Sequence, residues 1–230
     1  MTIRSRIFAV TYDRMIAKTE SAGLAAHRAG LLNGVTGRVL EIGGGTGANL
    51  VHYGSGLESL TVTEPESAML KRLRRRVEQV APTATVLRAP AEDLPFDDGV
   101  FDAVVTVATL HHVAAAPDVR AMLAELVRVT RPAGRIVVWD HNPRNPYWPV
   151  VMSRVPQDTG DERLIPEREV LAGLHGAGAR VLAARQLGWM PDFVPPRALP
   201  AVAIAERTLE RTPLLRRLGA HNVVLAAPPA

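Results

Sequence analysis

A short segment of the sequence combines one carboxylate with four glycines. Residues 41–47 read EIGGGTG, so Glu41 precedes Gly43, Gly44, Gly45 and Gly47. Glycine adopts backbone angles that a Cβ would forbid, and it lets a ligand lie directly against the main chain. A diphosphate would be repelled by Glu41, whereas a ligand with a cationic amino-acid end would be attracted. The segment therefore predicts a small-molecule site that receives an ammonium group.

A second carboxylate, Glu64, follows Glu41 by 23 residues and stands before Pro65. At the end of a second strand, a carboxylate accepts hydrogen bonds from both hydroxyls of a ribose, and an offset of roughly 20 residues suits that role. The simpler interpretation makes Glu64 the first residue of a helix, where the helix dipole favours an acid. Because an apolar strand, a glycine loop and a carboxylate occur together, we favour ribose binding.

Three histidines follow two other apolar segments. His111 and His112 come after the run at 101–107, and His141 comes after the run at 135–140. Histidine has a reference pKa near ~6.5 and suits a general base, which is needed only if the nucleophile carries a proton. The alternatives are a pocket-lining role or no base at all. A metal site from these histidines with Asp140 is not favoured, because adjacent histidines on an extended chain rarely point the same way; we expect no metal.

Strand-like and helix-like segments alternate along the chain, which implies a mostly parallel sheet with helices on both faces. We predict strands at 39–42, 60–63, 85–88, 101–107, 135–140, 180–187 and 221–227, and helices at 12–32, 47–53, 66–80, 118–129, 166–175 and 199–211. Residues 131–134 are predicted as a turn, and 141–165 and 189–200 as irregular excursions. The fold class is α/β: a Rossmann-like, doubly wound, seven-stranded sheet with a small cap formed by insertions.

Composition limits the class of protein. The 230 residues suit one domain, with a helical lid at 1–34, a ligand-binding core at 35–140 and cap insertions with the last strands at 141–230. There is no cysteine, so a disulfide framework is excluded. No run approaches the ~18 apolar residues of a membrane span, and we expect a cytoplasmic protein without an integral membrane segment. The basic cluster at 71–76 is interpreted as a solvated helix face rather than a nucleic-acid site.

Four stretches together resemble the class I S-adenosylmethionine-dependent methyltransferases, particularly the small-molecule group that includes the ubiquinone and menaquinone methyltransferases. They are VLEIGGGTG (39–47), VTEP (62–65), AEDLPFDDGVFDAVV (91–105) and LVRVTRPAGRIVV (126–138). Residues 12–32 and 213–227 further resemble a thiol-methyltransferase-like branch. The resemblance implies S-adenosyl-L-methionine as cofactor, S-adenosyl-L-homocysteine as product and a small molecule as methyl acceptor.

The resemblance also implies roles for individual residues. Glu41 and the glycine loop would hold the methionine end of the cofactor, Glu64 the ribose, and Ala91 with Glu92 the adenine edge. Relatives commonly have an aspartate where this chain has Pro90. Tyr12 would close over the cofactor or simply pack its helix. The implied cofactor-binding set is Tyr12, Glu41, Gly43, Gly44, Gly45, Gly47, Glu64, Pro65, Ala91, Glu92, Val107 and Thr109.

Apolar residues in the two excursions would line an acceptor pocket or pack the cap onto the sheet. They are Tyr147, Trp148, Val150, Val151, Met152, Trp189, Met190 and Phe193. The Asn/Asp-Pro-Pro-Tyr/Trp motif of amine-directed DNA and protein methyltransferases is replaced by VATLHHV at 107–113, so we expect no nucleic-acid substrate. We predict methyl transfer by in-line displacement to an apolar or aromatic molecule. The alternatives are a cofactor-binding protein with a role in rearrangement or partner assembly, and an NAD(P)-dependent oxidoreductase. The sequence leaves open whether the protein forms a homodimer.

Overall fold

The computed structural model describes residues 24–113, 115–152, 162–188, 204, 206, 208, 209, 211, 212 and 214–229. Its helices are α2 (Ala25–Leu32), η2 (Leu50–His52), α3 (Ser67–Val80), α4 (Leu110–Val113), α5 (Ala116–Val129), α6 (Tyr147–Met152), α7 (Glu167–Gly176) and η4 (Leu215–Leu218). Its strands are β1 (Gly37–Ile42), β2 (Leu57–Thr63), β3 (Thr85–Leu87), β4 (Phe101–Val107), β5 (Thr130–His141), β6 (Arg180–Leu187) and β7 (His221–Ala227).

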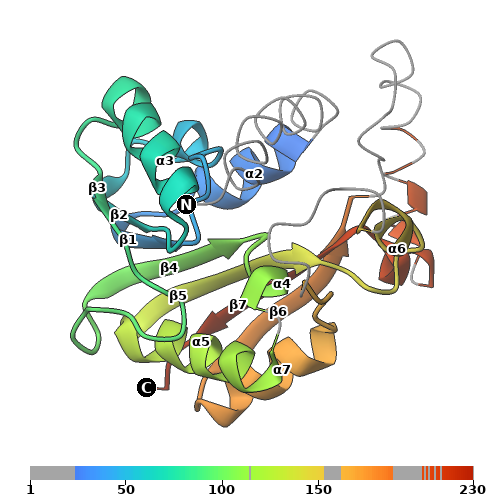
Figure 1. The fold of residues 1–230 in the computed structure, drawn as a ribbon. Coiled ribbons are helices and arrows are strands. Elements are labelled where there is room, and N and C mark those ends of the chain that lie inside the picture. The colour runs from blue at the N-terminus through green and yellow to red at the C-terminus, as the bar shows by residue number, and fades with distance from the viewer. Residues whose placement is uncertain are drawn as a thin grey trace.

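The seven strands form one sheet in the order β3-β2-β1-β4-β5-β7-β6 (Figure 1). β1 to β5 pair in parallel, and β7 runs antiparallel to both of its neighbours. The chain moves outward from β1 to β3 on one side and then from β4 onward on the other side. The carboxyl ends of β1 and β4 therefore flank a topological switch point, where ligands of such sheets bind. The predicted seven-stranded, mostly parallel α/β fold is confirmed.

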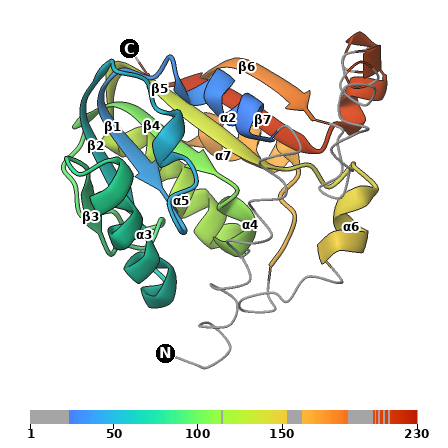
Figure 2. The ribbon, with the colours of Figure 1, turned by 90° about the horizontal axis from the view of Figure 1, so that it is seen from above.

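Helices cover both faces of the sheet, with α2 and α3 on one face and α5 and α7 on the other (Figure 2). Alternate residues of each strand therefore enter two different cores. In β4, Val104 belongs to the core beneath α5 and α7, whereas Val105 and Val107 belong to the core beneath α2 and α3. Burial on both faces explains why the strand sequences are continuously apolar rather than alternating.

The helix predicted at 47–53 is wrong. Residues 45–49 are turns, and only Leu50–His52 form a single 3₁₀ turn. Gly47 has φ +86°, outside the helical region, and its N–H donates to the Gly44 carbonyl at 2.8 Å. The local hydrogen bonds that follow span three residues, as in the bond from the His52 N–H to the Asn49 carbonyl at 2.9 Å.

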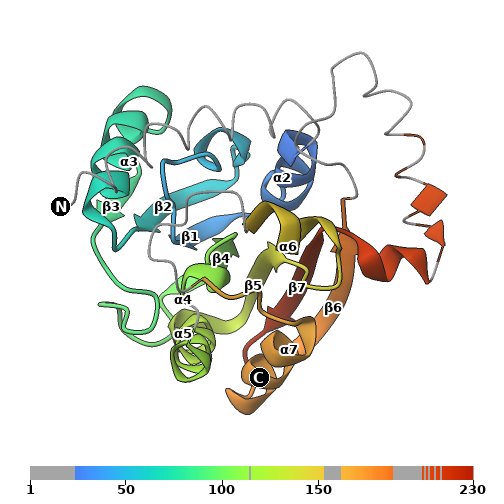
Figure 3. The same ribbon diagram turned by 45° about the vertical axis from the view of Figure 1, so that its right-hand side comes forward.

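Two further boundaries differ from the prediction. The 141–165 excursion contains a helix, α6, which lies beside the carboxyl end of β5 and the start of β7 (Figure 3). Asn145 starts it by accepting a hydrogen bond from the Tyr147 N–H at 2.8 Å. β5 begins at Thr130, and the turn predicted at 131–134 is a bulge within the strand, with Ala133 at φ +63°. The expected cap residues 153–161 and 189–203 lie outside the described residues.

Candidate active site

The glycine loop is fastened to the end of β2 by main-chain hydrogen bonds. The N–H groups of Gly43 and Gly44 both donate to the Thr63 carbonyl at 2.9 Å. The Gly45 N–H donates to Glu64 Oε2 at 2.8 Å, and the Glu66 N–H donates to Glu64 Oε1 at 2.9 Å. The predicted loop and the predicted ribose carboxylate are therefore in direct contact.

The glycines of the loop serve different purposes. A Cβ on Gly43, which has φ +71°, would collide with Thr109, and one on Gly44 would collide with Val62. A Cβ on Gly47 would come within 2.8 Å of Leu50 Cδ1. Gly45 differs, because with φ +56° an added Cβ would meet no atom of the described residues within 4 Å. Three glycines thus permit close packing, and the fourth faces open space where a ligand could approach the main chain.

Glu41 is buried on β1 beneath the loop, and the chain itself supplies partners for both of its oxygens. Asn49 Nδ2 donates to Oε1 at 2.8 Å, and the Tyr53 hydroxyl donates to Oε2 at 2.8 Å. Burial raises the pKa of Glu41, while these hydrogen bonds and the charge of Arg28 oppose that rise. Direct contact between Glu41 and the cofactor stays a prediction. Glu64 is also buried, with 6% of its surface exposed.

The end of β4 packs against the glycine loop. Thr109 Oγ1 lies 3.3 Å from the Ile42 carbonyl and 3.3 Å from the Val107 carbonyl. Ala108 between them has φ +55°, an uncommon conformation for a residue with a Cβ, and its N–H donates to the Trp139 carbonyl at 2.7 Å. Thr109 therefore adjoins Gly43, and the segment after β4 contacts both the glycine loop after β1 and the end of β5.

The residues predicted at the adenine edge have unequal exposure. Ala91 is buried in the core beneath α5, whereas Glu92 and Pro65 are exposed. The Pro65 carbonyl accepts a hydrogen bond from Arg88 Nε at 2.9 Å. The adenine role of this segment stays a prediction.

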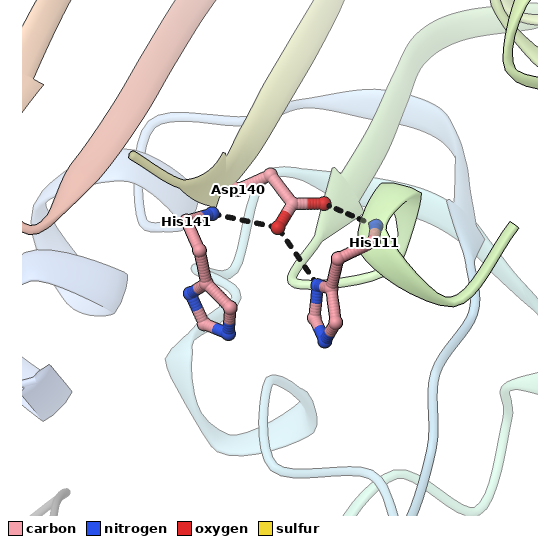
Figure 4. A group of neighbouring side chains, drawn as sticks. All are labelled: His111, Asp140 and His141. Carbon is pink, nitrogen blue, oxygen red and sulfur yellow. Dashed lines mark hydrogen bonds and ion pairs between the residues drawn. The ribbon is translucent and has the colours of Figure 1, made fainter. Parts of the chain in front are cut away.

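His111 and Asp140 form a buried pair at the carboxyl ends of β4 and β5 (Figure 4). His111 Nδ1 lies 2.8 Å from Asp140 Oδ1, and the His111 main-chain N–H donates to Oδ2 at 3.1 Å. The His141 N–H donates to Oδ1 at 2.6 Å. In Figure 4 the Nε2 atom of His111 points away from Asp140, so it is the ring nitrogen that can accept a proton.

The protonation states within this group follow from burial and from the hydrogen bonds. Burial opposes ionisation of Asp140, but attraction to the imidazolium form of His111 and the hydrogen bonds from His111 and His141 outweigh it and hold the pKa of Asp140 well below its usual value. Burial, with repulsion from the imidazolium form of His111, lowers the pKa of His141 well below its usual value. Asp140 is therefore an anion beside a neutral His141 at pH 7.

The other predicted histidine, His112, is turned outward. Its side chain is 41% exposed, and its Nδ1 lies 3.8 Å from Glu162 Oε1. Among the described residues, His111, Asp140 and His141 have possible metal-ligating atoms within 4.8 Å of one another. The Asp140 oxygens in that group already accept the hydrogen bonds described above.

Aromatic rings adjoin the histidines on the side of α6. The Trp148 ring stacks on His141 with centroids 3.7 Å apart and planes at 23°, and the Tyr147 ring meets Trp148 edge-on at 5.1 Å. The Trp148 indole N–H donates to the Ala220 carbonyl. Of the other predicted site or pocket residues, Tyr12, Trp189, Met190 and Phe193 lie outside the described residues, as do the side chains of Val150, Val151 and Met152.

The sequence interpretation missed polar residues that reach this site from elsewhere. His221 lies opposite His141 on β7, its ring is 5.2 Å from Trp139, and its Nδ1 has no hydrogen-bond partner among the described residues. Burial, with the charge of His27, lowers the pKa of His221 to about 3. Arg28 on α2 is likewise buried against Asn49. No local signal marked these residues, because their neighbours are 80 and 21 positions away in the sequence.

Comparisons with known proteins match the region that carries this site. Residues 40–138 match the family model described as "Methyltransferase domain". The chain is 30% identical to a phosphatidylethanolamine N-methyltransferase of Cereibacter sphaeroides over 188 residues, which are 80% of this chain and 77% of that protein. It is 40% identical to a demethylmenaquinone methyltransferase of Mycolicibacterium gilvum over 102 residues, which are 44% of this chain and 40% of that protein.

A SAM-dependent methyltransferase from Thermotoga maritima has a similar fold, with a TM-score of 0.70 and 20% identity over 97% of both chains. At that identity the likeness concerns the fold alone. None of the described helices combines the length and the hydrophobicity that crossing a bilayer requires.

Proposed function

The chain belongs to the methyltransferase domain family, as a class I S-adenosylmethionine-dependent methyltransferase of the small-molecule type, and from this premise we propose that His111 removes a proton from an apolar or aromatic acceptor during methylation. The observation that carries the proposal is the buried 2.8 Å contact between His111 Nδ1 and Asp140 Oδ1 beside the switch point. Such a contact fixes a histidine in one tautomer and one orientation.

The residues at the switch point fit the cofactor that the family implies. Open space at Gly45 lets a ligand lie against the main chain. Glu64 adjoins that space through its hydrogen bond with Gly45, and carboxylate oxygens are suitable acceptors for ribose hydroxyls. Val107 and Thr109 would border the methyl-donor end. When bound, S-adenosyl-L-methionine would supply an activated methyl group, and S-adenosyl-L-homocysteine would be released.

The protein's own contribution to the reaction is orientation and proton removal. His111 Nε2 would accept the proton of the acceptor's nucleophile while Nδ1 keeps its proton in the hydrogen bond to Asp140. Asp140, held as an anion, stabilises the imidazolium that forms. His141 stays neutral and, through its main-chain N–H, fixes the carboxylate. General-base assistance of this kind contributes about 10²–10⁴-fold to turnover.

The surroundings of His111 favour an acceptor with an apolar or aromatic body. The His141 ring lies 4.4 Å from the His111 ring and stacks on the buried Trp148, so the groups beside the base are aromatic and uncharged. Two relatives are named for acceptors of lipid character, phosphatidylethanolamine and demethylmenaquinone. We therefore propose a lipid-like or aromatic small molecule that carries a protonated oxygen or nitrogen nucleophile.

The first experiment establishes ligand binding. Thermal unfolding is followed with S-adenosylhomocysteine, NAD or NADP, because a ligand that binds only the native state raises its stability by RT ln(1 + [L]/Kd). We expect a higher Tm with S-adenosylhomocysteine alone. A panel of phenols, quinols and amino lipids is then incubated with radiolabelled S-adenosylmethionine. Binding without labelled product from any acceptor would favour the non-methylating alternative.

The second experiment compares two neighbouring histidines. His111→Gln should lower kcat at least ~100-fold, with the Kd of S-adenosylhomocysteine within twofold of wild type. His112→Gln is the matched control and should lower kcat less than ~5-fold, because His112 makes no contact with Asp140 comparable to that of His111. Equal losses in the two variants would contradict the assignment of His111 as the base.

A further inference from the structure

Arg28 places a buried cation between the two halves of the site. It lies on α2 with 6% of its surface exposed, and its Nη1 donates to Asn49 Oδ1 just after the glycine loop. Its guanidinium also lies 5.4 Å from the centre of the Trp139 ring on β5. One side chain therefore contacts both the segment that follows β1 and the strand that carries Asp140.

The contact with Asn49 continues to Glu41. Asn49 Nδ2 donates to Glu41 Oε1 at 2.8 Å, and the Tyr53 hydroxyl donates to Oε2 at 2.8 Å. Asn49 uses its oxygen toward Arg28 and its nitrogen toward Glu41, so a single amide joins the cation to the anion. Replacing Asn49 by an apolar residue would remove the hydrogen-bond partner of a buried polar atom on each side of it. The hydrogen bonds among Arg28, Asn49 and Glu41 therefore specify one arrangement of these side chains.

Strand register explains how Arg28 spans the sheet. Glu41 pairs with Val105, and Val107 on the same face pairs with Trp139. Arg28 thus crosses β4 on the face covered by α2, from the position of Glu41 to that of Trp139. The Trp139 carbonyl accepts the hydrogen bond from Ala108 at 2.7 Å, and the next residue is Asp140.

We infer that Arg28 is a positioning residue for cofactor binding, which braces the segment after the glycine loop against β5. Through Asn49 it holds the segment after the glycine loop against Glu41, and through the face of Trp139 it holds the strand that presents Asp140. The hydrogen bond between Arg28 and Asn49 is directional, whereas the contact between Arg28 and the Trp139 ring is not. Replacing Arg28 should therefore weaken cofactor binding more than it lowers turnover. This inference rests on the proposed function, because it assigns the glycine loop to the cofactor.

The test is a double-mutant cycle on the affinity for S-adenosylhomocysteine, measured by calorimetry. Arg28→Met and Asn49→Leu should each raise Kd about tenfold. Because both substitutions interrupt the same connection, the double variant should raise Kd about 10–20-fold rather than ~100-fold. In Arg28→Met, kcat with a turned-over acceptor should fall less than about threefold at saturating cofactor. Arg28→Lys, which keeps the charge, should recover part of the affinity.

The matched control is Arg38→Met. Arg38 is the second residue of β1, at the amino end of the strand and so away from the site, its side chain is 43% exposed, and it forms an ion pair with Asp102 at 3.5 Å. Its replacement should lower Tm while leaving Kd within twofold. If Arg28→Met and Asn49→Leu also lower Tm without changing Kd, or if their effects on Kd multiply, the inference is overturned. If instead the wild-type protein fails to bind S-adenosylhomocysteine, the proposed function itself fails.

Discussion

Replacing Glu64 by glutamine tests the cofactor site with little change in shape. The glutamine keeps one acceptor oxygen, so one of the two hydrogen bonds from the N–H groups of Gly45 and Glu66, now 2.8 and 2.9 Å long, can persist. The other carboxylate oxygen becomes an NH₂ group, which donates and cannot accept. The side chain also loses its negative charge. A ribose whose two hydroxyls donate to Glu64 would therefore keep one bond to a neutral oxygen, while its other hydroxyl would have to accept from the NH₂ group, so that both bonds become neutral.

The expected loss follows from the strength of charged hydrogen bonds. A hydrogen bond to a charged group contributes about 1.5–3 kcal/mol and a neutral one about 0.5–1.5 kcal/mol. A difference of about 1 kcal/mol for each hydroxyl amounts to about 2 kcal/mol, or roughly a 30-fold higher Kd, since about 1.4 kcal/mol corresponds to a factor of ten. The Kd of S-adenosylhomocysteine for Glu64→Gln should thus rise between ~10- and ~100-fold.

Calorimetric titration with S-adenosylhomocysteine gives this Kd directly, and Glu66→Gln is the control. Glu66 Oε2 accepts hydrogen bonds from the N–H groups of Ala68 and Met69 at the start of α3. Its replacement should cost up to ~1 kcal/mol of stability, as loss of a helix cap does, and should leave Kd within twofold. Unchanged affinity in Glu64→Gln, or an equal loss in both variants, would refute the ribose role.

Three more substitutions address the loop, the base and the buried histidines. Gly45→Ala should fold, with a cost of about 1 kcal/mol for its left-handed backbone, and should bind S-adenosylhomocysteine at least ~10-fold more weakly by calorimetry, because its Cβ enters the open space. Asp140→Asn should lower single-turnover methyl transfer at least ~100-fold with Kd unchanged, since the imidazolium loses its anion. The pKa of His221 is about 3 in the native state against ~6.5 unfolded, so between these values the unfolded state binds the extra proton and stability falls as pH falls. In His221→Gln, the free energy of unfolding measured in urea should therefore change less steeply with pH between pH 6 and 4, by the equivalent of up to one bound proton. If the free energy changes as steeply as in the wild type, His221 is not a neutral buried residue.

Local patterns were sufficient to predict the strands. The run at 101–107 is apolar on both faces because Val104 packs beneath α5 and α7 while Val105 packs beneath α2 and α3. Continuous hydrophobicity of that kind, bounded by turn residues, predicts a central parallel strand. The doubly wound, mostly parallel arrangement followed from their alternation with helices and from the resemblance to a known family, whereas the order of the strands comes from the structure.

Features that depend on distant partners were not predictable. Residues 47–53 have a helical pattern, but Asn49 turns its side chain to Glu41 and Gly47 adopts a left-handed angle. The prolines around α6 favoured an irregular segment over a helix, so the cap at Asn145 was not predicted. Asn145 Nδ2 also donates to the Leu218 carbonyl at 2.7 Å. His221 comes beside His141 only because β7 inserts antiparallel next to β5.

The contrast between the carboxylates also bears on the class of acceptor. Burial raises the pKa of Glu41, whereas attraction to the imidazolium form of His111 and the hydrogen bonds from His111 and His141 hold Asp140 ionised despite burial. An anion fixed at Nδ1 of His111 assists a reaction only when Nε2 takes up a proton, as methylation of a hydroxyl or ammonium group requires. A nucleophile that is already deprotonated would gain little from it. In Asp140→Asn, turnover should therefore fall sharply with a phenol at neutral pH and fall little at a higher pH, where the acceptor is already a phenolate. That result would show that the His111–Asp140 pair serves to remove the proton of the acceptor.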